Sequence, residues 1–250
     1  MRLLYIFMTK YYYKIRKNIL IDTGHSESHN HHIVLKDFIT AGVMMKIYEY
    51  GNPNADTILI QPVVDHDMEY IENEIALIKE SSKKDFKLIA VKVDNWNNDL
   101  SPWKAPAVFG NEDFGGEACR MLDEVLKLTE DKTKTYYIGG YSLAGLFALW
   151  TVYQTDFFSG VVAASPSIWF PGFIDYMKAN EIKVQNIYLS LGDKEEKAKN
   201  PTMATVGDCI REVYAWLSEK GVNVVLEWNH GNHFKDADVR TAKGFVWGMR

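Results

Sequence analysis

The chain has 250 residues, of which 47% are hydrophobic and 24% are charged, values typical of a globular protein. This length suits one α/β domain with a large core. The formal net charge of −5 argues against nucleic acid or an anionic membrane surface as a partner, because both attract a basic face.

The sequence contains no run of about 18 apolar residues, so we expect no membrane span. Residues 1–17 carry a short apolar patch between charges and lack the small-residue cleavage site of a signal peptide. The two cysteines, Cys119 and Cys209, lie in helix-like segments and suit buried thiols in a reducing compartment better than a disulfide framework. We therefore expect a cytoplasmic protein.

Residues 1–43 differ from the rest of the chain. Lysine and tyrosine dominate the first part, and the run HSESHNHH then gathers four imidazoles: His25, His29, His31 and His32. Clustered imidazoles can bind a metal, but this run lacks apolar support, so we favour a poorly ordered or non-native extension. The predicted domain is 44–250, and we expect neither a bound metal nor a cofactor.

From Met44 onward the pattern becomes regular. Alternation over 45–50 predicts an edge strand, 57–60 predicts a buried strand, and 61–67 predicts a loop. His66 in this loop could be a ligand, although a capping cluster is favoured because Asp67 suits a helix N-cap. The next predicted elements are a helix over 69–81, a strand over 87–93, a long Trp-, Asn-, Pro- and Gly-rich segment over 94–116, and a helix over 117–130.

The stretch TYYIGGYSLAGLFALW, residues 135–150, is the most informative part of the chain. An apolar strand leads into Gly140, Ser142 and Ala144, and an apolar helix follows. Strand, G-x-S-x-A and helix together are typical of a nucleophile elbow, in which a serine lies on a very tight turn. Side chains two residues before and after that serine would collide, so Gly140 and Ala144 are small, and Gly145 lets the helix approach the strand.

Further apolar strands follow the elbow and alternate with helices. We predict strands over 160–164, 186–191 and 222–228, and helices over 171–179, 206–220 and 238–249, with a charged loop over 194–200. Five or six such strands indicate a mostly parallel central sheet with helices on both faces. Function in such sheets gathers at the carboxyl ends of the strands, and the polar candidates fall there.

A serine hydroxyl needs a base to take its proton and an acid to orient that base. The chain order serine, acid, histidine of this fold class is present. His233 is favoured as the base because it lies in the loop beyond Gly231, whereas His230 lies almost on the strand. Glu195 is favoured as the acid, with Asp193 as the runner-up. The remaining alternatives are Glu196, a solvated charged loop at this place, and a serine–histidine dyad.

The oxyanion formed during attack needs two backbone N–H donors. The first is expected at Leu143, directly after the nucleophile, and the second at Val63 or Val64 in the loop after the 57–60 strand. Three tryptophans lie in loops at strand ends and either line a substrate pocket or anchor the loops to the core: Trp96, Trp103 and Trp169.

The stretches GGYSLAGLFALW, AASPSIWF and GNHFKDADVR together resemble an esterase family of the α/β-hydrolases, the group that includes enterochelin (siderophore) esterases, feruloyl esterases and S-formylglutathione hydrolase. The resemblance covers roughly residues 45–250. It implies an α/β-hydrolase fold with Ser142 as nucleophile and His233 as base. The acid varies in this family, and some members work as a dyad. Arginine clusters suited to an anionic catecholate are not evident in the loops, which weakens a siderophore substrate specifically.

The sequence therefore predicts a serine esterase that cleaves a small-molecule carboxylic ester through an acyl-enzyme, without a cofactor. Two other functions remain open. One is acyl transfer to an alcohol or thiol, and the other is a non-catalytic binding protein of the same fold. The sequence carries no signal for an oligomeric state.

Overall fold

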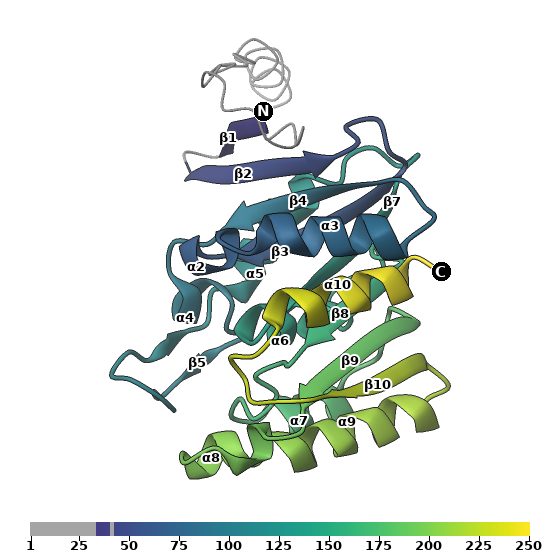
Figure 1. Cartoon of the computed structure of the whole chain (residues 1–250). Coiled ribbons are helices and arrows are strands. Elements are labelled where there is room, and N and C mark those ends of the chain that lie inside the picture. Colours follow the sequence, from purple (N-terminus) through teal and green to yellow (C-terminus); the bar gives the residue numbers. More distant parts are fainter. Residues whose placement is uncertain (1–33, 41–42) are drawn as a thin grey trace.

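The computed structural model describes residues 34–40 and 43–250. Its centre is an eight-stranded sheet with the order β1-β2-β4-β3-β7-β8-β9-β10 (Figure 1). The strands are β1 (Val34–Thr40), β2 (Val43–Gly51), β3 (Thr57–Val63), β4 (Phe86–Lys92), β7 (Thr135–Tyr141), β8 (Gly160–Ala164), β9 (Asn186–Gly192) and β10 (Asn223–Asn229). From β4 to β10 all neighbours run parallel, and β1 and β2 are antiparallel additions, so the predicted mostly parallel sheet is confirmed.

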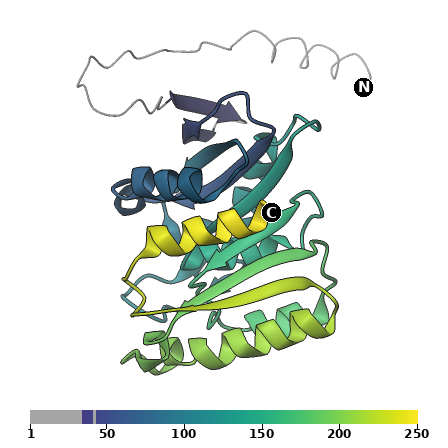
Figure 2. The same cartoon turned by 45° about the vertical axis from the view of Figure 1, so that its right-hand side comes forward.

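Helices cover both faces of the sheet, as predicted. On one face α3 (Ile71–Ser81) lies beside α10 (Ala237–Gly248), which crosses β7, β8 and β9 (Figures 1 and 2). The opposite face carries α5 (Ala118–Lys127), α6 (Leu143–Thr151), α7 (Phe173–Ala179) and α9 (Val206–Glu219). The shorter helical segments are α2 (Asp65–Met68), α4 (Trp96–Asp99), η1 (Glu195–Lys197) and α8 (Pro201–Ala204). Among the described residues, no helix is long and apolar enough to cross a membrane.

Three local expectations were wrong. The strand predicted at the edge is β2, but β1 pairs along its outer side, because the extension before residue 44 contributes a strand of its own. The loop expected over 61–67 contains α2, in which Asp67 is the third residue and not the N-cap, and its carboxylate accepts the N–H of Val64. The segment 94–116 is not a plain loop, since it holds α4 and a small hairpin of β5 (Lys104–Ala105) and β6 (Phe114–Gly115).

The domain boundary at residue 44 stays a prediction. Apart from β1 and Val43, the preceding residues lie outside the described part of the chain, including all four histidines of the HSESHNHH run.

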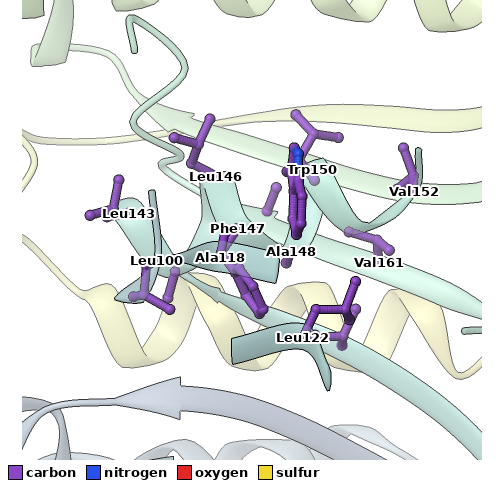
Figure 3. Packing of buried hydrophobic residues seen from close by; sticks show 14 of the residues in the cluster. Leu100, Ala118, Leu122, Leu143, Leu146, Phe147, Ala148, Trp150, Val152 and Val161 are labelled. Carbon is purple, nitrogen blue, oxygen red and sulfur yellow. The ribbon is translucent and has the colours of Figure 1, made fainter. Parts of the chain in front are cut away.

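The two apolar layers follow from the alternation of side chains along each strand. In β3, Ile58 and Ile60 face the layer that holds α6, while Leu59 faces the layer that holds α3 and α10. Helix α6 is buried on every side, because it packs on β7 and β8 and its side chains share an apolar cluster with Ala118 and Leu122 of α5 (Figure 3). This complete burial holds the start of α6, and with it the preceding serine, in a fixed position.

Helix α3 also buries a carboxyl group. Glu74 is 3% exposed, and its Oε2 accepts a hydrogen bond from Nε2 of Gln61, a β3 residue that is equally buried, at 3.2 Å. Glu74 Oε1 and Gln61 Oε1 have no partner among the described residues. Burial raises the pKa of Glu74 to about 8, and the charges of Asp67 and Asp238 add to the rise. Because Glu74 Oε1 receives no hydrogen bond from the described residues, burial favours the neutral carboxyl at this place.

We expect this carboxyl to make the protein less stable as the pH rises. Its folded pKa of about 8 lies above the unfolded value near 4.3, so the folded state binds the extra proton between these limits. The free energy of unfolding should then fall by about 1.4 kcal/mol per pH unit over this window and level off above it. Urea unfolding at a series of pH values measures the slope.

The variant Glu74→Gln should remove this slope, because an amide stays neutral at every pH. The matched control is Glu80→Gln, which changes an exposed carboxyl of the same helix and should keep the slope. An unchanged slope in Glu74→Gln would show that Glu74 is already ionised in the folded protein.

Candidate active site

Ser142 lies on the tight turn between β7 and α6, where the sequence predicted a nucleophile elbow. Its backbone has φ 58° and ψ −120°, a positive-φ conformation that costs a non-glycine residue roughly 1–3 kcal/mol. A Cβ built on Gly140 would lie 2.6 Å from the Cβ of Ala144, so larger residues would collide across the turn. The steric reason for the two small residues is therefore confirmed.

The imidazole of His233 lies between a hydroxyl and a carboxylate. Its Nε2 is 3.0 Å from Ser142 Oγ, and its Nδ1 is 2.7 Å from Glu195 Oε2. The histidine belongs to the loop after β10, and the backbone of that loop is fixed because the hydroxyl of Tyr141 donates to the His233 carbonyl at 2.9 Å. The structure thus brings together the three side chains favoured from the sequence, in the order that proton transfer from a serine requires.

Glu195 begins the short helical turn η1 after β9 and is 5% exposed. Its second oxygen, Oε1, accepts hydrogen bonds from the Gly192 N–H at 2.7 Å and from Ser165 Oγ at 2.8 Å. Burial alone would raise the pKa of the Glu195 carboxyl, but the hydrogen bonds from His233, Ser165 and Gly192 outweigh burial and hold the pKa below its usual value. Glu195 is therefore a carboxylate at neutral pH, as an orienting acid must be.

The competing residues are engaged elsewhere. His230 Nδ1 lies 3.1 Å from Asp193 Oδ2, and this aspartate also accepts the Gly231 N–H at 2.8 Å. Glu196 pairs with Arg211 at 2.9 Å on α9. The runner-up acid and the runner-up base therefore contact each other at the surface, and neither contacts Ser142 or His233 through a hydrogen bond among the described residues.

The proposed oxyanion donors differ in whether their backbone N–H groups already form a hydrogen bond. Leu143 is the first residue of α6, so its N–H is one of the helix-end donors that the helix does not use. Val64 N–H already donates to Asp67 Oδ2 at 2.9 Å. The Val63 carbonyl accepts a hydrogen bond from the Val93 N–H on the β4 side. In an extended strand the N–H and the carbonyl of one residue point to the same side, so the Val63 N–H also faces β4. A second donor at Val64 therefore requires the Asp67 carboxylate to release it, and this donor stays a prediction.

The tryptophans mainly anchor loops. Trp103 packs on Phe170 and Tyr176, and its Nε1 donates to the Pro171 carbonyl at 3.0 Å, which ties the 94–116 segment to the start of α7. Trp96 begins α4 and packs against the core. Trp169 is 8% exposed and contacts the half-exposed ring of Phe109. A role for any of them in binding a substrate stays a prediction.

Two further side chains lie directly beside the serine and the histidine. Ser167 Oγ is 3.3 Å from Ser142 Oγ, and its N–H donates to the Ser142 carbonyl at 3.0 Å. Phe234 packs edge-on against the His233 ring and is 88% exposed. Among the described residues no group of three metal-binding side chains is arranged to hold an ion, and His66 is an exposed residue near Glu69.

Sequence reasoning missed the residues behind the acid. Arg240 on α10 contacts Glu195, and Ser165 donates to the same carboxylate from a backbone with φ 43°. Local sequence patterns hold one usable signal, because Arg240 falls on the buried side of a helix where an apolar residue is normal. Its partners lie far away along the chain, and only the folded structure identifies them.

No protein-family model matches the chain, and no curated protein matches it. Solved structures do match. An IroE-like serine hydrolase from Shewanella oneidensis is 12% identical, with a TM-score of 0.68 over 87% of this chain and 79% of that chain. The siderophore hydrolase EstA from Aspergillus nidulans is 17% identical, with a TM-score of 0.64 and coverages of 91% and 99%. The enterobactin esterase of Shigella flexneri is 13% identical, with a TM-score of 0.61 and coverages of 90% and 61%.

These similarities define the class of the fold, which is that of the α/β-hydrolases. The resemblance to siderophore esterases noted in the sequence is confirmed as a likeness of fold.

Proposed function

We propose that this protein is a serine hydrolase that cleaves a small-molecule carboxylic ester through an acyl-enzyme. The observation that carries the proposal is the continuous contact from Ser142 Oγ through His233 to Glu195, at 3.0 Å and 2.7 Å. The names of the structural neighbours, which describe a serine hydrolase, a siderophore hydrolase and an enterobactin esterase, support an ester as the substrate class.

In the first half of the reaction Ser142 Oγ attacks the ester carbonyl carbon while His233 Nε2 takes its proton. Glu195 holds Nδ1–H and stabilises the imidazolium that forms. The negative charge on the former carbonyl oxygen is stabilised by the Leu143 N–H at the start of α6, where the helix dipole adds to the effect, and by a second donor near the end of β3. The tetrahedral intermediate collapses, and the alcohol leaves with the proton from His233.

In the second half a water molecule replaces the alcohol. His233 takes a proton from this water as it attacks the acyl carbon, and the same imidazole then returns a proton to Ser142 Oγ. The products are a carboxylic acid and an alcohol, and the protein returns to its starting state without a cofactor.

A fluorophosphonate probe tests the acyl-enzyme directly, because it reacts only with an activated serine. We expect one label per folded chain, on the peptide that contains Ser142, and hydrolysis of short-chain p-nitrophenyl esters by the same preparation. Peptide mass spectrometry locates the label.

Two variants control this experiment. Ser142→Ala should take no label, whereas Ser167→Ala, which removes the neighbouring hydroxyl, should still be labelled. A folded protein that neither reacts with the probe nor cleaves any ester of the panel would favour a binding protein of this fold and would end the proposal.

A further inference from the structure

Arg240 is buried in the interior beside the site. It is 1% exposed and leads the fully buried side chains by volume. Its Nη1 lies 2.8 Å from Glu195 Oε1, 2.9 Å from the Tyr141 hydroxyl and 3.0 Å from Ser165 Oγ. Its Nη2 donates to the Asn232 carbonyl at 3.0 Å. One guanidinium therefore reaches the acid, the strand before the nucleophile and the loop that carries the base.

Stability alone does not account for this arginine. Burying an ion pair removes two charges from water, and an apolar pair of similar volume is often as stable or more so. Arg240 Nε is also buried without a partner among the described residues, which adds a desolvation cost. The contacts that offset this cost all go to groups that hold Ser142, His233 or Glu195 in place.

The planar shape of the guanidinium explains why an arginine suits this place. Its Nη1 binds the acid that follows β9, while Nη2 binds the backbone one residue before His233, after β10. The two Nη groups of a planar guanidinium are held at a fixed distance, so they set the spacing between the two loops. The ammonium group of a lysine lies on a flexible chain and cannot do this. The Tyr141 hydroxyl extends the connection, because it accepts from Arg240 and donates to the His233 carbonyl.

We propose that Arg240 is a positioning residue that holds Glu195 and the His233 loop in register and balances the charge of the acid. The proposal rests on the proposed function, in which His233 must be neutral to accept the serine proton. Without the cation, the Glu195 carboxylate would act unopposed on the imidazole beside it and would favour the imidazolium.

Several other charged groups near the two loops pair with one another, while Lys194 and Lys197, which flank Glu195 in the chain, are exposed cations. Asp193 lies against His230 on the loops after β9 and β10, and Glu196 lies against Arg211 of α9. Lys235 and Asp236 face each other beyond His233 at 3.8 Å. From the β7 side the Tyr141 phenol is neutral, because burial raises its pKa to about 12. Among the described residues, Arg240 is the permanent cation that forms an ion pair with Glu195.

The test compares Arg240→Met, which removes the charge, with Arg240→Lys, which keeps the charge and loses the fork. NMR titration of the His233 ring measures its protonation midpoint without any substrate, and the pH profile of kcat/KM measures the same event during turnover. Fluorophosphonate labelling counts intact sites, so that rates are expressed per labelled chain. The matched control is Arg211→Met, which removes an exposed cation next to Glu196.

In Arg240→Met we expect the His233 midpoint and the acidic limb of kcat/KM to move up by about one pH unit. The rate per labelled site should fall about 10–100-fold, because a misplaced base is costly. Arg240→Lys should lose rate by a similar factor and keep the wild-type midpoint, and Arg211→Met should change neither quantity.

The proposal is overturned if Arg240→Met keeps both the wild-type midpoint and the wild-type rate per labelled site. If Arg240→Met does not fold, Arg240→Lys decides, and a wild-type rate in that variant overturns the proposal. Failure of the proposed function gives a different result, since the wild-type protein would then take no label while the NMR midpoints still report the effect of Arg240 on His233.

Discussion

Replacing Ser142 by alanine should lower kcat for an activated ester on the order of 10⁶-fold, and replacing His233 should cost about as much. The two side chains act as one unit, because the hydroxyl is a nucleophile only while Nε2, 3.0 Å away, takes its proton. The double variant should therefore be no slower than either single variant. Stopped-flow or long-time assays on p-nitrophenyl acetate, corrected for spontaneous hydrolysis, measure all three.

The loss of activity in these variants must be distinguished from a loss of folding. All three should still fold, because neither Ser142 nor His233 belongs to the apolar clusters of the described residues, and circular dichroism and the thermal midpoint check this. Losses that multiply in the double variant would mean that the serine and the histidine act independently, and the triad assignment would then be wrong.

The second large effect is expected for Glu195→Gln, with a fall in kcat of roughly 10⁴-fold. The cause is the hydrogen-bond pattern around the carboxylate. Arg240, Ser165 and the Gly192 N–H all donate to Oε1, so the oxygen of a glutamine amide must take that position. Its NH₂ group then faces Nδ1 of His233. This forces the proton of the imidazole onto Nε2, where it blocks acceptance of the serine proton.

Neighbouring acids provide matched controls for this prediction. Asp193→Asn disturbs the pair with His230, and Glu196→Gln disturbs the pair with Arg211. Both residues lie within two positions of Glu195 in the chain. Each should change kcat by less than about threefold, as surface pairs contribute little. A loss in Asp193→Asn equal to that in Glu195→Gln would assign the acid to the runner-up.

Much of this arrangement could be predicted from the sequence because it is determined locally. The strand, the small residues around Ser142 and the apolar helix that follows are one continuous stretch, and its geometry follows from steric limits. The parallel sheet follows from the alternation of apolar strands with helices, and parallel strands bring the segments after β7, β9 and β10 to one edge. Ser142, Glu195 and His233 were therefore found as neighbours without any contact information.

Contacts between distant segments could not be predicted in this way. The pairing of β1 with β2 and the engagement of Val64 by Asp67 depend on how separate segments meet. The same is true of Arg240, whose partners include Tyr141, almost a hundred residues earlier in the chain. The position of Arg240 on the buried side of α10 marks it as unusual, but its partners are identified only by the folded structure.

The position of β10 in the sheet has a consequence for how the molecule loses activity. This strand pairs with β9 alone among the described residues, and most of its side chains are only half buried. Outer segments of this kind open locally at a lower free energy than the centre of a fold. Because His233 follows β10, such an opening would separate the base from Ser142 while the central strands stay paired. If the proposed function holds, loss of activity on heating or in denaturant should precede global unfolding, because it depends on the local stability of β10.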